Sequence, residues 1–413
     1  MHTLDQLNRG ELKGIVRLQL SENLTVFPEA IFDLAESLEI LDLSNNSLSE
    51  LPADLSRFKK LRILFCSNNR FTQLPEVLGQ CENLEMIGFK SNQITSVSSD
   101  SLPTLTRWLI LTDNKIDSLP EDFGKLIRLQ KLALAGNRLT SLPDSIVNCR
   151  NLELVRLSAN QLVAFPDALL ELPRLAWLAF SGNPFCAERD PHNEFKTVQF
   201  RDLELHQVLG QGASGVISLA TWRENTFDFS DSVAVKVFKG EVTSDGYPED
   251  ELDACLAVGN HRSLVQPLAK VTEVDCSALV MELIPAHYTN LGQPPSLVSC
   301  TRDTFVVDQQ FSIDKIIRIV EQVDQLVAHF CEKEVSHGDL YAHNILINEE
   351  GHVLFGDFGA ASKYANLSPQ QQKGIERIER RALGFFIDDM LSLCVEEDRN
   401  SDLYKVLRSH AFS

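Results

Sequence analysis

Apolar residues recur along the first half of the chain with a period of 23 residues. One copy of the pattern reads Leu38-x-x-Leu41-x-Leu43-x-x-Asn46-x-Leu48-x-x-Leu51-Pro52, and the next copy places Leu61, Leu64, Cys66, Asn69, Phe71, Leu74 and Pro75 at the same positions. The asparagine of the pattern returns at Asn23, Asn46, Asn69, Asn92, Asn114, Asn137, Asn160 and Asn183, with one step of 22 residues. A fixed period of this length indicates stacked coils that share one core.

The pattern resembles eight leucine-rich repeats, so the first half is expected to form an α/β solenoid. Its apolar positions would point into the shared core. Each repeated asparagine would hydrogen-bond backbone groups at the inner turn and form a ladder between neighbouring coils. We place this domain at residues 1–195, with a short cap at about 182–191 after the last repeat.

Strand residues that point outward would form the concave face of the solenoid. The residue before the second leucine of each repeat gives Arg17, Ile40, Ile63, Met86, Trp108, Lys131, Leu154 and Trp177, and the next outward column adds Phe65 and Ile110. A continuous apolar surface of this kind predicts a contact. Two interpretations stay open: the face binds a separate protein, such as a partner or substrate, or it packs against the chain's own second half and restrains it.

The second half changes to mixed strand and helix patterns and carries four ordered motifs. A glycine-rich stretch, Gly210-Gln211-Gly212-Ala213-Ser214-Gly215, precedes an alternating apolar strand that holds Val233-Ala234-Val235-Lys236. Downstream, His337-Gly338-Asp339-Leu340-Tyr341-Ala342-His343-Asn344 is followed by Asp357-Phe358-Gly359. Apolar residues recur at helical spacing from Asp314 to Glu334, which predicts a long helix before the third motif.

The order and spacing of these motifs resemble a eukaryotic-type protein kinase domain. The resemblance implies an α+β two-lobed fold over residues 196–413, with a small lobe at about 198–283 and a large lobe at about 284–413. It covers about half of the chain.

The resemblance also implies a role for each motif. Lys236 would hold the α and β phosphates of ATP, with Glu251 as its carboxylate partner and Glu249 as the alternative. Asp339 would be the catalytic base, and Asn344 and Asp357 would be the Mg²⁺ ligands. The nucleotide would be enclosed by residues from the glycine-rich loop, the neighbouring strands and the interlobe hinge: Leu209, Gly210, Gly212, Gly215, Ile217, Ala234, Met281, Glu282 and Ile284.

Several positions depart from the usual kinase pattern. Gly338 replaces the arginine that usually precedes the catalytic aspartate, so switching by a phosphorylated activation loop is not expected. Tyr341 stands where serine/threonine kinases place a lysine, and Glu379 stands where kinases place an aspartate that braces the catalytic loop. No Ala-Pro-Glu follows Asp357, and we expect a shortened large lobe with a small substrate platform.

The composition of the chain bears on its cellular location and on its possible partners. The net charge is −20, which argues against nucleic acid as a partner. Nine cysteines without a Cys-x-x-Cys pair indicate neither a disulfide framework nor structural zinc. The chain starts without a signal-peptide pattern and has no apolar run long enough to span a bilayer. We therefore expect a cytoplasmic location.

These features together predict an ATP- and Mg²⁺-dependent protein kinase, with serine/threonine acceptors favoured over tyrosine. Ser362, Tyr364 and Ser368 are candidate sites of self-phosphorylation. Two alternatives stay open: a pseudokinase scaffold whose repeat face is the functional part, and a small-molecule phosphotransferase, since antibiotic kinases also have His-Gly-Asp loops. The substrate, the ligand of the repeat face, the oligomeric state and the organism are not readable from the sequence.

Overall fold

The computed structural model describes residues 2–411 except 187–194, 213–214, 226, 228, 240–241, 244 and 274–275. Residues 187–191 of the predicted cap after the last repeat, and Ala213 and Ser214 of the glycine-rich stretch, lie outside the described residues. The chain divides into two compact units, one of residues 1–175 with 183–185 and one of residues 176–182 with 186–413. The predicted domain boundary between residues 195 and 196 stays a prediction.

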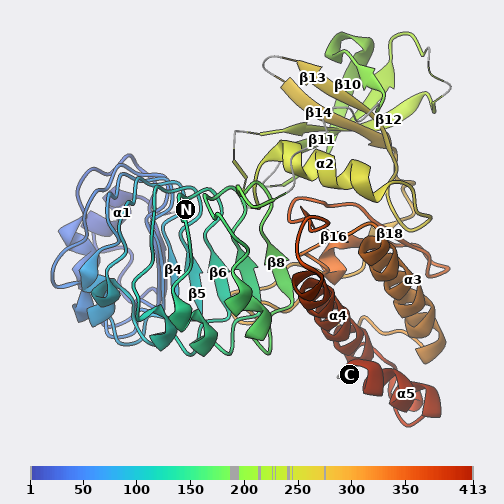
Figure 1. Ribbon diagram of the computed structural model, residues 1–413. Helices are drawn as coiled ribbons and strands as arrows, with labels where there is room; N and C mark the ends of the chain where they lie inside the picture. Colours follow the sequence, from blue (N-terminus) through green and yellow to red (C-terminus); the bar gives the residue numbers. More distant parts are fainter. Residues whose placement is uncertain are drawn as a thin grey trace. The chain divides into compact units, whose positions relative to one another are not determined.

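The repeats form one parallel sheet of eight three-residue strands that follow each other in chain order (Figure 1). The strands are β1 (Arg17–Gln19), β2 (Ile40–Asp42), β3 (Ile63–Phe65), β4 (Met86–Gly88), β5 (Trp108–Ile110), β6 (Lys131–Ala133), β7 (Leu154–Arg156) and β8 (Trp177–Ala179). The period of 23 brings equivalent residues into register, so Ile40 lies beside Ile63 and Ile63 beside Met86. The sheet and the α/β solenoid predicted from the repeats are therefore confirmed.

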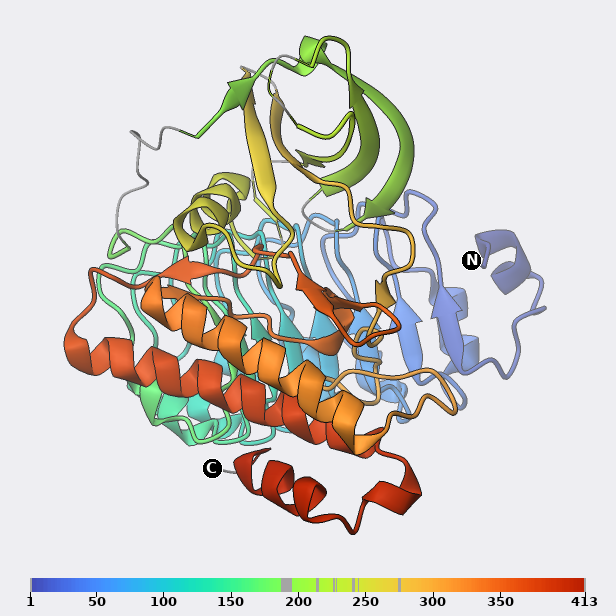
Figure 2. The same ribbon diagram turned by 90° about the vertical axis from the view of Figure 1, so that its right-hand side faces the viewer.

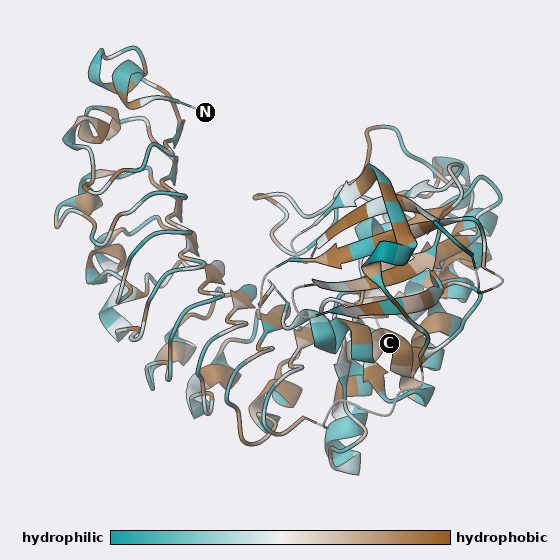
Figure 3. Cartoon of the chain, turned by 90° about the horizontal axis from the view of Figure 1, so that it is seen from above, coloured by the Kyte–Doolittle hydropathy of each residue, from teal (hydrophilic) through white to brown (hydrophobic). Residues whose placement is uncertain are grey.

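Each coil returns to the next strand through turns and short 3-10 helices. These are η1 (Glu29–Leu34), η2 (Leu55–Arg57), η3 (Glu76–Gln80), η4 (Ser99–Ser101), η5 (Phe123–Lys125), η6 (Asp144–Asn148) and η7 (Asp167–Glu171), and the short helix α1 (Leu4–Asn8) precedes the first strand. The repeated leucines are fully buried, as Leu41 and Leu64 show. Figure 3 shows the resulting alternation of hydrophobic and hydrophilic segments along the coils.

The repeated asparagines from Asn46 to Asn183 form the predicted ladder, whereas Asn23 is exposed and makes none of these hydrogen bonds within the described residues. Asn137 donates from Nδ2 to the carbonyls of Leu111 and Leu134, both at 2.9 Å, and accepts from the backbone N–H of Ile116 at 3.0 Å. The same pattern joins Asn160 to the backbone at Leu134, Leu157 and Leu139. One buried side chain thus satisfies backbone groups of two neighbouring coils, which explains why asparagine recurs.

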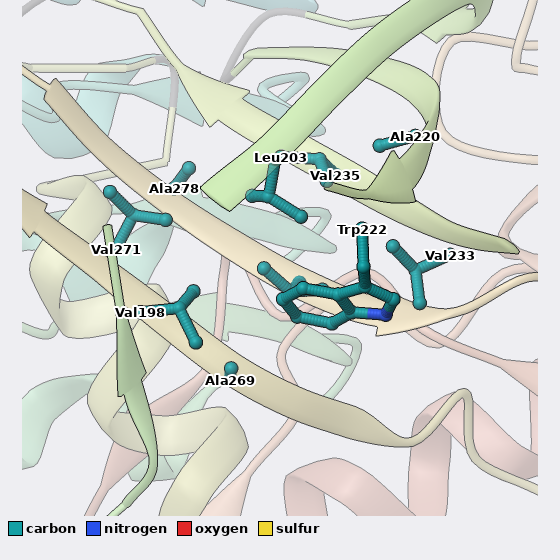
Figure 4. Packing of buried hydrophobic residues seen from close by; sticks show 10 residues of the cluster. Val198, Leu203, Ala220, Trp222, Val233, Val235, Ala269, Val271 and Ala278 are labelled. Carbon is teal, nitrogen blue, oxygen red and sulfur yellow. The ribbon is translucent and has the colours of Figure 1, made fainter. Parts of the chain in front are cut away.

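The second unit begins with a small lobe built on a mixed sheet. Its strands are ordered β10-β11-β12-β14-β13-β9, and one helix, α2 (Pro248–Val258), accompanies them. The bounds are β9 (Thr197–Val198), β10 (Leu203–Gln211), β11 (Gly215–Trp222), β12 (Ser232–Phe238), β13 (Pro267–Glu273) and β14 (Cys276–Glu282). Figure 4 shows the indole of Trp222 among Val198, Val233 and Ala269 in the core on one face of this sheet.

The large lobe is mainly helical. Helix α3 (Ile313–Glu332) packs against α4 (Pro369–Ser392), and α4 packs against α5 (Asp402–Ala411) (Figure 2). Two small sheets complete this lobe. Strand β15 (Thr289–Asn290), which precedes α3 in the chain, pairs with β17 (Ile345–Ile347), and β17 pairs with β18 (Val353–Phe355); β16 (Val335–Ser336) pairs with β19 (Ser362–Lys363). The helix predicted from Asp314 to Glu334 is confirmed as α3.

Two properties of the described residues concern the predicted compartment. None of the helices in this part of the chain combines the length and the apolar run needed to cross a bilayer. The eight cysteines whose side chains are described are all free thiols, and burial raises the pKa of Cys66, Cys149 and Cys255. Cytoplasmic location itself stays a prediction.

Candidate active site

Lys236 lies on β12, in the middle of the small-lobe sheet. It pairs with Ile217 of β11 on one side and with Leu279 of β14 on the other. Its neighbours Val235 and Val233 point into the hydrophobic core, so the strand's alternation directs Lys236 to the opposite face. The side chain is only 9% exposed. A buried ammonium needs a carboxylate partner, and the structure provides two.

Glu251 and Asp357 both contact the Lys236 ammonium. Glu251 sits in the first turn of α2, is buried, and accepts a hydrogen bond from Lys236 Nζ through Oε1. Asp357 Oδ1 lies 3.6 Å from Lys236 Nζ and accepts from the backbone N–H of Gly359 at 3.2 Å. Residues 236, 251 and 357, which the sequence assigned to one site, therefore lie together, and the alternative partner Glu249 does not take this place.

The pKa shifts of the three groups follow from burial and mutual charge. Burial raises the pKa of Glu251 to about 7, and the Lys236 ammonium opposes that rise. Burial disfavours the ammonium of Lys236, but the carboxylates of Asp357 and Glu251 outweigh it and raise the Lys236 pKa. Burial likewise opposes ionisation of Asp357, and Lys236 together with the Gly359 N–H lowers the Asp357 pKa. Asp357 and Lys236 are therefore charged near neutral pH, and Glu251 titrates there.

Asp339 and Asn344 form a second pair, in the loop between β16 and β17. Asn344 Nδ2 donates to Asp339 Oδ2 at 2.8 Å and to the Asp339 carbonyl at 3.1 Å. Its amide nitrogen thus faces Asp339, which leaves the amide oxygen as the atom available to a cation. His337 also holds the loop in place. Its Nδ1 accepts a hydrogen bond from the Asp339 N–H at 3.3 Å, and its ring packs on Phe355.

Glu379 braces the start of this loop, as the sequence predicts. The carboxylate comes from α4 and is 2% exposed. Its Oε1 accepts from Ser336 Oγ at 2.7 Å and from the Gly338 N–H at 3.1 Å, and its Oε2 accepts from the His337 N–H at 3.2 Å. One side chain therefore fixes three consecutive residues just before Asp339.

The predicted phosphate loop is the hairpin between β10 and β11. A Cβ atom added at Gly210 or Gly212 would meet no atom of the described residues within 4 Å, so these residues leave space open next to both glycines. Gly215 differs, because an added Cβ would lie 2.5 Å from the Val237 carbonyl oxygen. Its smallness serves strand packing, while Gly210 and Gly212 leave room for a ligand to approach the backbone. Leu209 is about half exposed on β10.

The predicted adenine-binding residues lie around the end of β14. Met281 is buried and pairs with Ala234 of β12. The N–H of Glu282 donates to the Gln266 carbonyl at 3.0 Å. Ile284 makes no hydrogen bond within the described residues, so its backbone groups are available to a ligand. The adenine-binding role of these residues stays a prediction.

Sequence reasoning named Trp177 as part of the outward column, but gave it no partner in the catalytic loop, and it missed Asp303. Trp177 stacks on Tyr341 with ring centroids 4.4 Å apart and donates from Nε1 to the Leu340 carbonyl at 3.0 Å. Asp303, whose carboxylate is fully buried, accepts from the His343 N–H at 3.2 Å and contacts His343 Nδ1 at 2.6 Å. No motif surrounds Asp303, so the sequence carries no signal for it.

The structure argues against two of the three candidate self-phosphorylation sites. Ser362 is fully buried and Tyr364 is 1% exposed. The Ser362 hydroxyl accepts from the backbone N–H groups of Phe180 and Ser181, at 2.9 and 3.1 Å. Ser368 is exposed, but its side chain caps α4.

In the repeat unit, the register places the predicted column of outward residues side by side from Arg17 to Leu154. Lys131 lies over the ring of Trp108, with Nζ 4.4 Å from the ring centroid. The occupant of this surface stays a prediction.

Family comparisons match both halves of the chain. The model of the protein tyrosine and serine/threonine kinase family matches residues 203–383. Models of leucine-rich repeats match residues 36–79, 103–162 and 127–185. The chain therefore consists of leucine-rich repeats followed by a domain of the protein tyrosine and serine/threonine kinase family, and the resemblance inferred from the motifs is confirmed.

Similarity to individual proteins is confined to parts of them. The chain is 25% identical to fibroblast growth factor receptor 1 of Xenopus laevis over 169 residues, which is 38% of this chain and 21% of the receptor. It is 28% identical to a putative neurotrophin receptor of Lymnaea stagnalis over 174 residues, 40% of this chain and 22% of that one. It is 25% identical to the interferon-induced, double-stranded RNA-activated protein kinase of Rattus norvegicus over 116 residues, 24% of this chain and 23% of that one. The chain thus spans about a fifth of the length of the curated relatives it matches.

Among solved structures, the leucine-rich-repeat protein LIC12759 of Leptospira interrogans is 32% identical with a TM-score of 0.36. The match covers 42% of this chain and 50% of that one.

Proposed function

We propose that this protein is an ATP- and Mg²⁺-dependent protein kinase that transfers the γ-phosphate to protein hydroxyl groups, with serine and threonine preferred. The observation that carries the proposal is the contact of one buried ammonium, Lys236, with both Glu251 and Asp357. Burying the charged groups of Lys236 and Glu251 together costs free energy, and a packed hydrophobic core would not need them. Such an arrangement fits a site that binds phosphates.

The donor atoms of the site suit the nucleotide and its metal ion. Asp357 offers a half-exposed carboxylate whose pKa is lowered, and Asn344 offers an amide oxygen. Oxygen ligands of these kinds are those that Mg²⁺ prefers. Among the described residues, none fills the space next to Gly210 and Gly212 and none hydrogen-bonds the backbone of Ile284, which suits binding of the phosphates and the adenine. When bound, MgATP supplies the phosphoryl group and neutralises the negative charge on its oxygens.

The residues of the chain would then act by position and charge. Glu251 holds the ammonium of Lys236 toward the phosphates, and Asp339 orients the acceptor hydroxyl and takes its proton. Asn344 keeps the Asp339 carboxylate in one orientation through its 2.8 Å hydrogen bond. Glu379 and His337 fix the backbone on which Asp339 sits. A fixed base is effective because no reorganisation is needed when the substrate binds.

The experiment is transfer of labelled γ-phosphate from MgATP to myelin basic protein by the full chain. The wild type should transfer label, and Asp339→Asn should lose about 10²- to 10⁴-fold in rate, the usual contribution of a general base. Asp402→Asn, at a 99% exposed side chain on α5, is the control and should match the wild type. Phosphoamino acid analysis of the product tests the preference for serine and threonine. Equal transfer by wild type and Asp339→Asn would refute the proposal.

One observation favours a second candidate, a nucleotide-binding scaffold without transfer. Tyr341 stands where serine/threonine kinases place a lysine, and it is buried against Trp177. This position therefore brings no cation to the transferred phosphate. Thermal stabilisation by ATP without Mg²⁺, together with no transfer to any acceptor, would favour the scaffold.

For the repeats we propose a protein contact through the outward column of Ile40, Ile63, Phe65, Met86, Trp108, Ile110 and Leu154. The support is the register, which places Ile40, Ile63, Met86 and Trp108 side by side on four neighbouring strands. The contact would recruit a partner or substrate, or restrain the kinase domain. Crosslinking in lysate, compared between the wild type and Ile40→Glu/Ile63→Glu, tests whether this column binds another protein.

A further inference from the structure

Seven residues that the repeat pattern assigns to the last coil belong to the kinase unit. Residues 176–182 group with residues 186–413, and β8 packs beside α4. Trp177, the first residue of β8, is 1% exposed and lies between Tyr341 and Phe385, with ring centroids 4.4 and 5.3 Å away. Its Nε1–H donates to the Leu340 carbonyl at 3.0 Å. Leu340 directly follows Asp339, so β8 holds the catalytic loop one residue from the proposed base.

Gly338 lets β8 come this close. It has φ +69°, and an added Cβ would lie 2.6 Å from the Leu178 carbonyl oxygen and 2.8 Å from that of Ala360. A side chain at this position would displace either the strand or the loop. Gly338 occupies the position of the arginine that most kinases have before the catalytic aspartate. The replacement of arginine by Gly338 therefore has a physical reason, because the backbone of β8 lies where the side chain would be.

A second set of contacts links the end of β8 to the helix that carries Glu251. The Ser362 hydroxyl accepts from the N–H groups of Phe180 and Ser181. The next residue, Lys363, pairs with Asp253 of α2 at 2.5 Å. Gly182, with φ +69°, packs directly on α2, because an added Cβ would lie 2.6 Å from Asp250 Oδ2. The same short segment thus contacts both the loop that carries Asp339 and the helix that carries Glu251.

We infer that residues 176–182 are a permanent brace of the kinase domain, with Trp177 as a positioning residue for the catalytic loop. This inference deepens the proposed kinase function and rests on it. The brace does the work that an ordered activation segment does elsewhere: it holds the catalytic loop and the α2 helix in their productive places without phosphorylation. The kinase domain therefore begins, in physical terms, at the last repeat strand.

Burial distinguishes a brace from a removable inhibitor. Trp177 and Tyr341 are at most 4% exposed, and Ser362 is fully buried. Detaching β8 would expose two large aromatic rings to water and leave the Leu340 carbonyl and two backbone N–H groups without their partners. Both changes carry a substantial free-energy cost. The contact is therefore part of the folded core, and removing it should weaken catalysis.

The test is Trp177→Phe in the full chain, which keeps an aromatic ring but deletes the N–H donated to Leu340. Trp222→Phe is the matched control, because the Trp222 indole also donates to a backbone carbonyl, that of Ser230 at 3.1 Å, within the small-lobe core. Ser362→Ala is a second, milder variant that removes the hydroxyl under Phe180 and Ser181. The measurements are kcat and KM for ATP, and hydrogen exchange of segments 336–345 and 248–258.

For Trp177→Phe we expect kcat to fall about tenfold, the size expected from one buried hydrogen bond with its partner left unpaired, with KM for ATP unchanged. Exchange of segment 336–345 should accelerate in this variant, and exchange of 248–258 should accelerate in Ser362→Ala. Trp222→Phe should change neither segment. Unchanged exchange and kcat in Trp177→Phe, or a rise in kcat, would overturn the inference. A wild type without transfer whose exchange still depends on Trp177 would refute the kinase proposal alone and leave the brace standing.

Discussion

The indole N–H of Trp177 donates to the carbonyl oxygen of Leu340, although 163 residues separate them in the chain. One residue comes from the strand of the last repeat, and the other follows the proposed catalytic base. The hydrogen bond makes a repeat strand part of the kinase domain. It also explains two unusual residues of the catalytic loop: Gly338 gives β8 room, and Tyr341 provides the surface on which Trp177 stacks.

Gly338→Ala should destabilise the protein by about 2–4 kcal/mol, because it combines a left-handed backbone with a clash against Leu178. Gly351→Ala is the control. Gly351 has φ +85°, but an added Cβ there would meet only side-chain atoms of Lys315 and Arg318, at 3.6 Å or more. It should cost only the backbone strain, about 1–2 kcal/mol. Urea denaturation measures both, and equal losses would show that β8 does not press on the loop.

Activity should fall as pH drops through about 7, because burial raises the pKa of Glu251 to about 7 and the protonated side chain no longer holds Lys236 as an ion pair. Stability without nucleotide should change in the opposite direction. The unfolded carboxyl has a pKa near 4.3, so the folded chain binds the proton more tightly. The stability that protonation of Glu251 contributes is therefore present at low pH and is lost as pH rises through the folded pKa.

Glu251→Gln should abolish both pH trends and lower kcat/KM for ATP by about 10- to 100-fold. Rate profiles from pH 5.5 to 8.5 and denaturation at the same pH values test this. A profile that is unchanged in Glu251→Gln would assign the titration to another group.

Glu379→Gln should lower kcat by about tenfold or more, because an amide can accept through only one of its two terminal atoms and Glu379 accepts through both. Glu376→Gln, one turn earlier on α4, is the control and should stay within about twofold. Steady-state kinetics with ATP and a protein acceptor provide the measurement. A KM effect without a kcat effect would contradict a role in holding the catalytic loop.

Asn137→Ala should destabilise the repeat unit by about 2–4 kcal/mol, since it leaves two backbone carbonyls and one N–H of two coils without a partner. Asn151→Ala, at an exposed side chain that bonds only the Ile127 carbonyl, should cost less than about 1 kcal/mol. Urea denaturation followed by circular dichroism compares them. Equal losses of unfolding free energy in the two variants would contradict a stabilising role of the asparagine ladder.

The sequence predicts the parts of this molecule whose chemistry repeats or is local. The repeat period sets the strand register, because equivalent residues 23 positions apart must lie side by side. The helical spacing of apolar residues predicts the position of α3. The order of the motifs, through the resemblance to kinases, predicts that Lys236, Glu251 and Asp357 lie together. Glu379 was also predictable, since its charge and position match a known brace.

Other features arise only from folding in three dimensions. The partner of Trp177 depends on how the last coil meets the catalytic loop, and no local pattern encodes that meeting. Asp303 lies in an irregular segment, so neither period nor motif predicts its contact with His343. The burial of Ser362 and Tyr364 could not be predicted either, because polar residues in a loop after Asp357 are expected to be exposed to solvent. Gly338 could have indicated this close packing from the sequence, because a glycine in place of the usual arginine leaves room for another segment of the chain.

The central claim is that Lys236 and Glu251 act as one unit on a bound nucleotide, and a double-mutant cycle tests it most directly. The cycle measures kcat/KM for ATP in phosphoryl transfer by the wild type, Lys236→Met, Glu251→Gln and the double variant. We predict strong coupling, with the double variant no more than about threefold slower than Lys236→Met alone. Losses that multiply in the double variant, or a wild type that transfers no phosphate, would contradict the account.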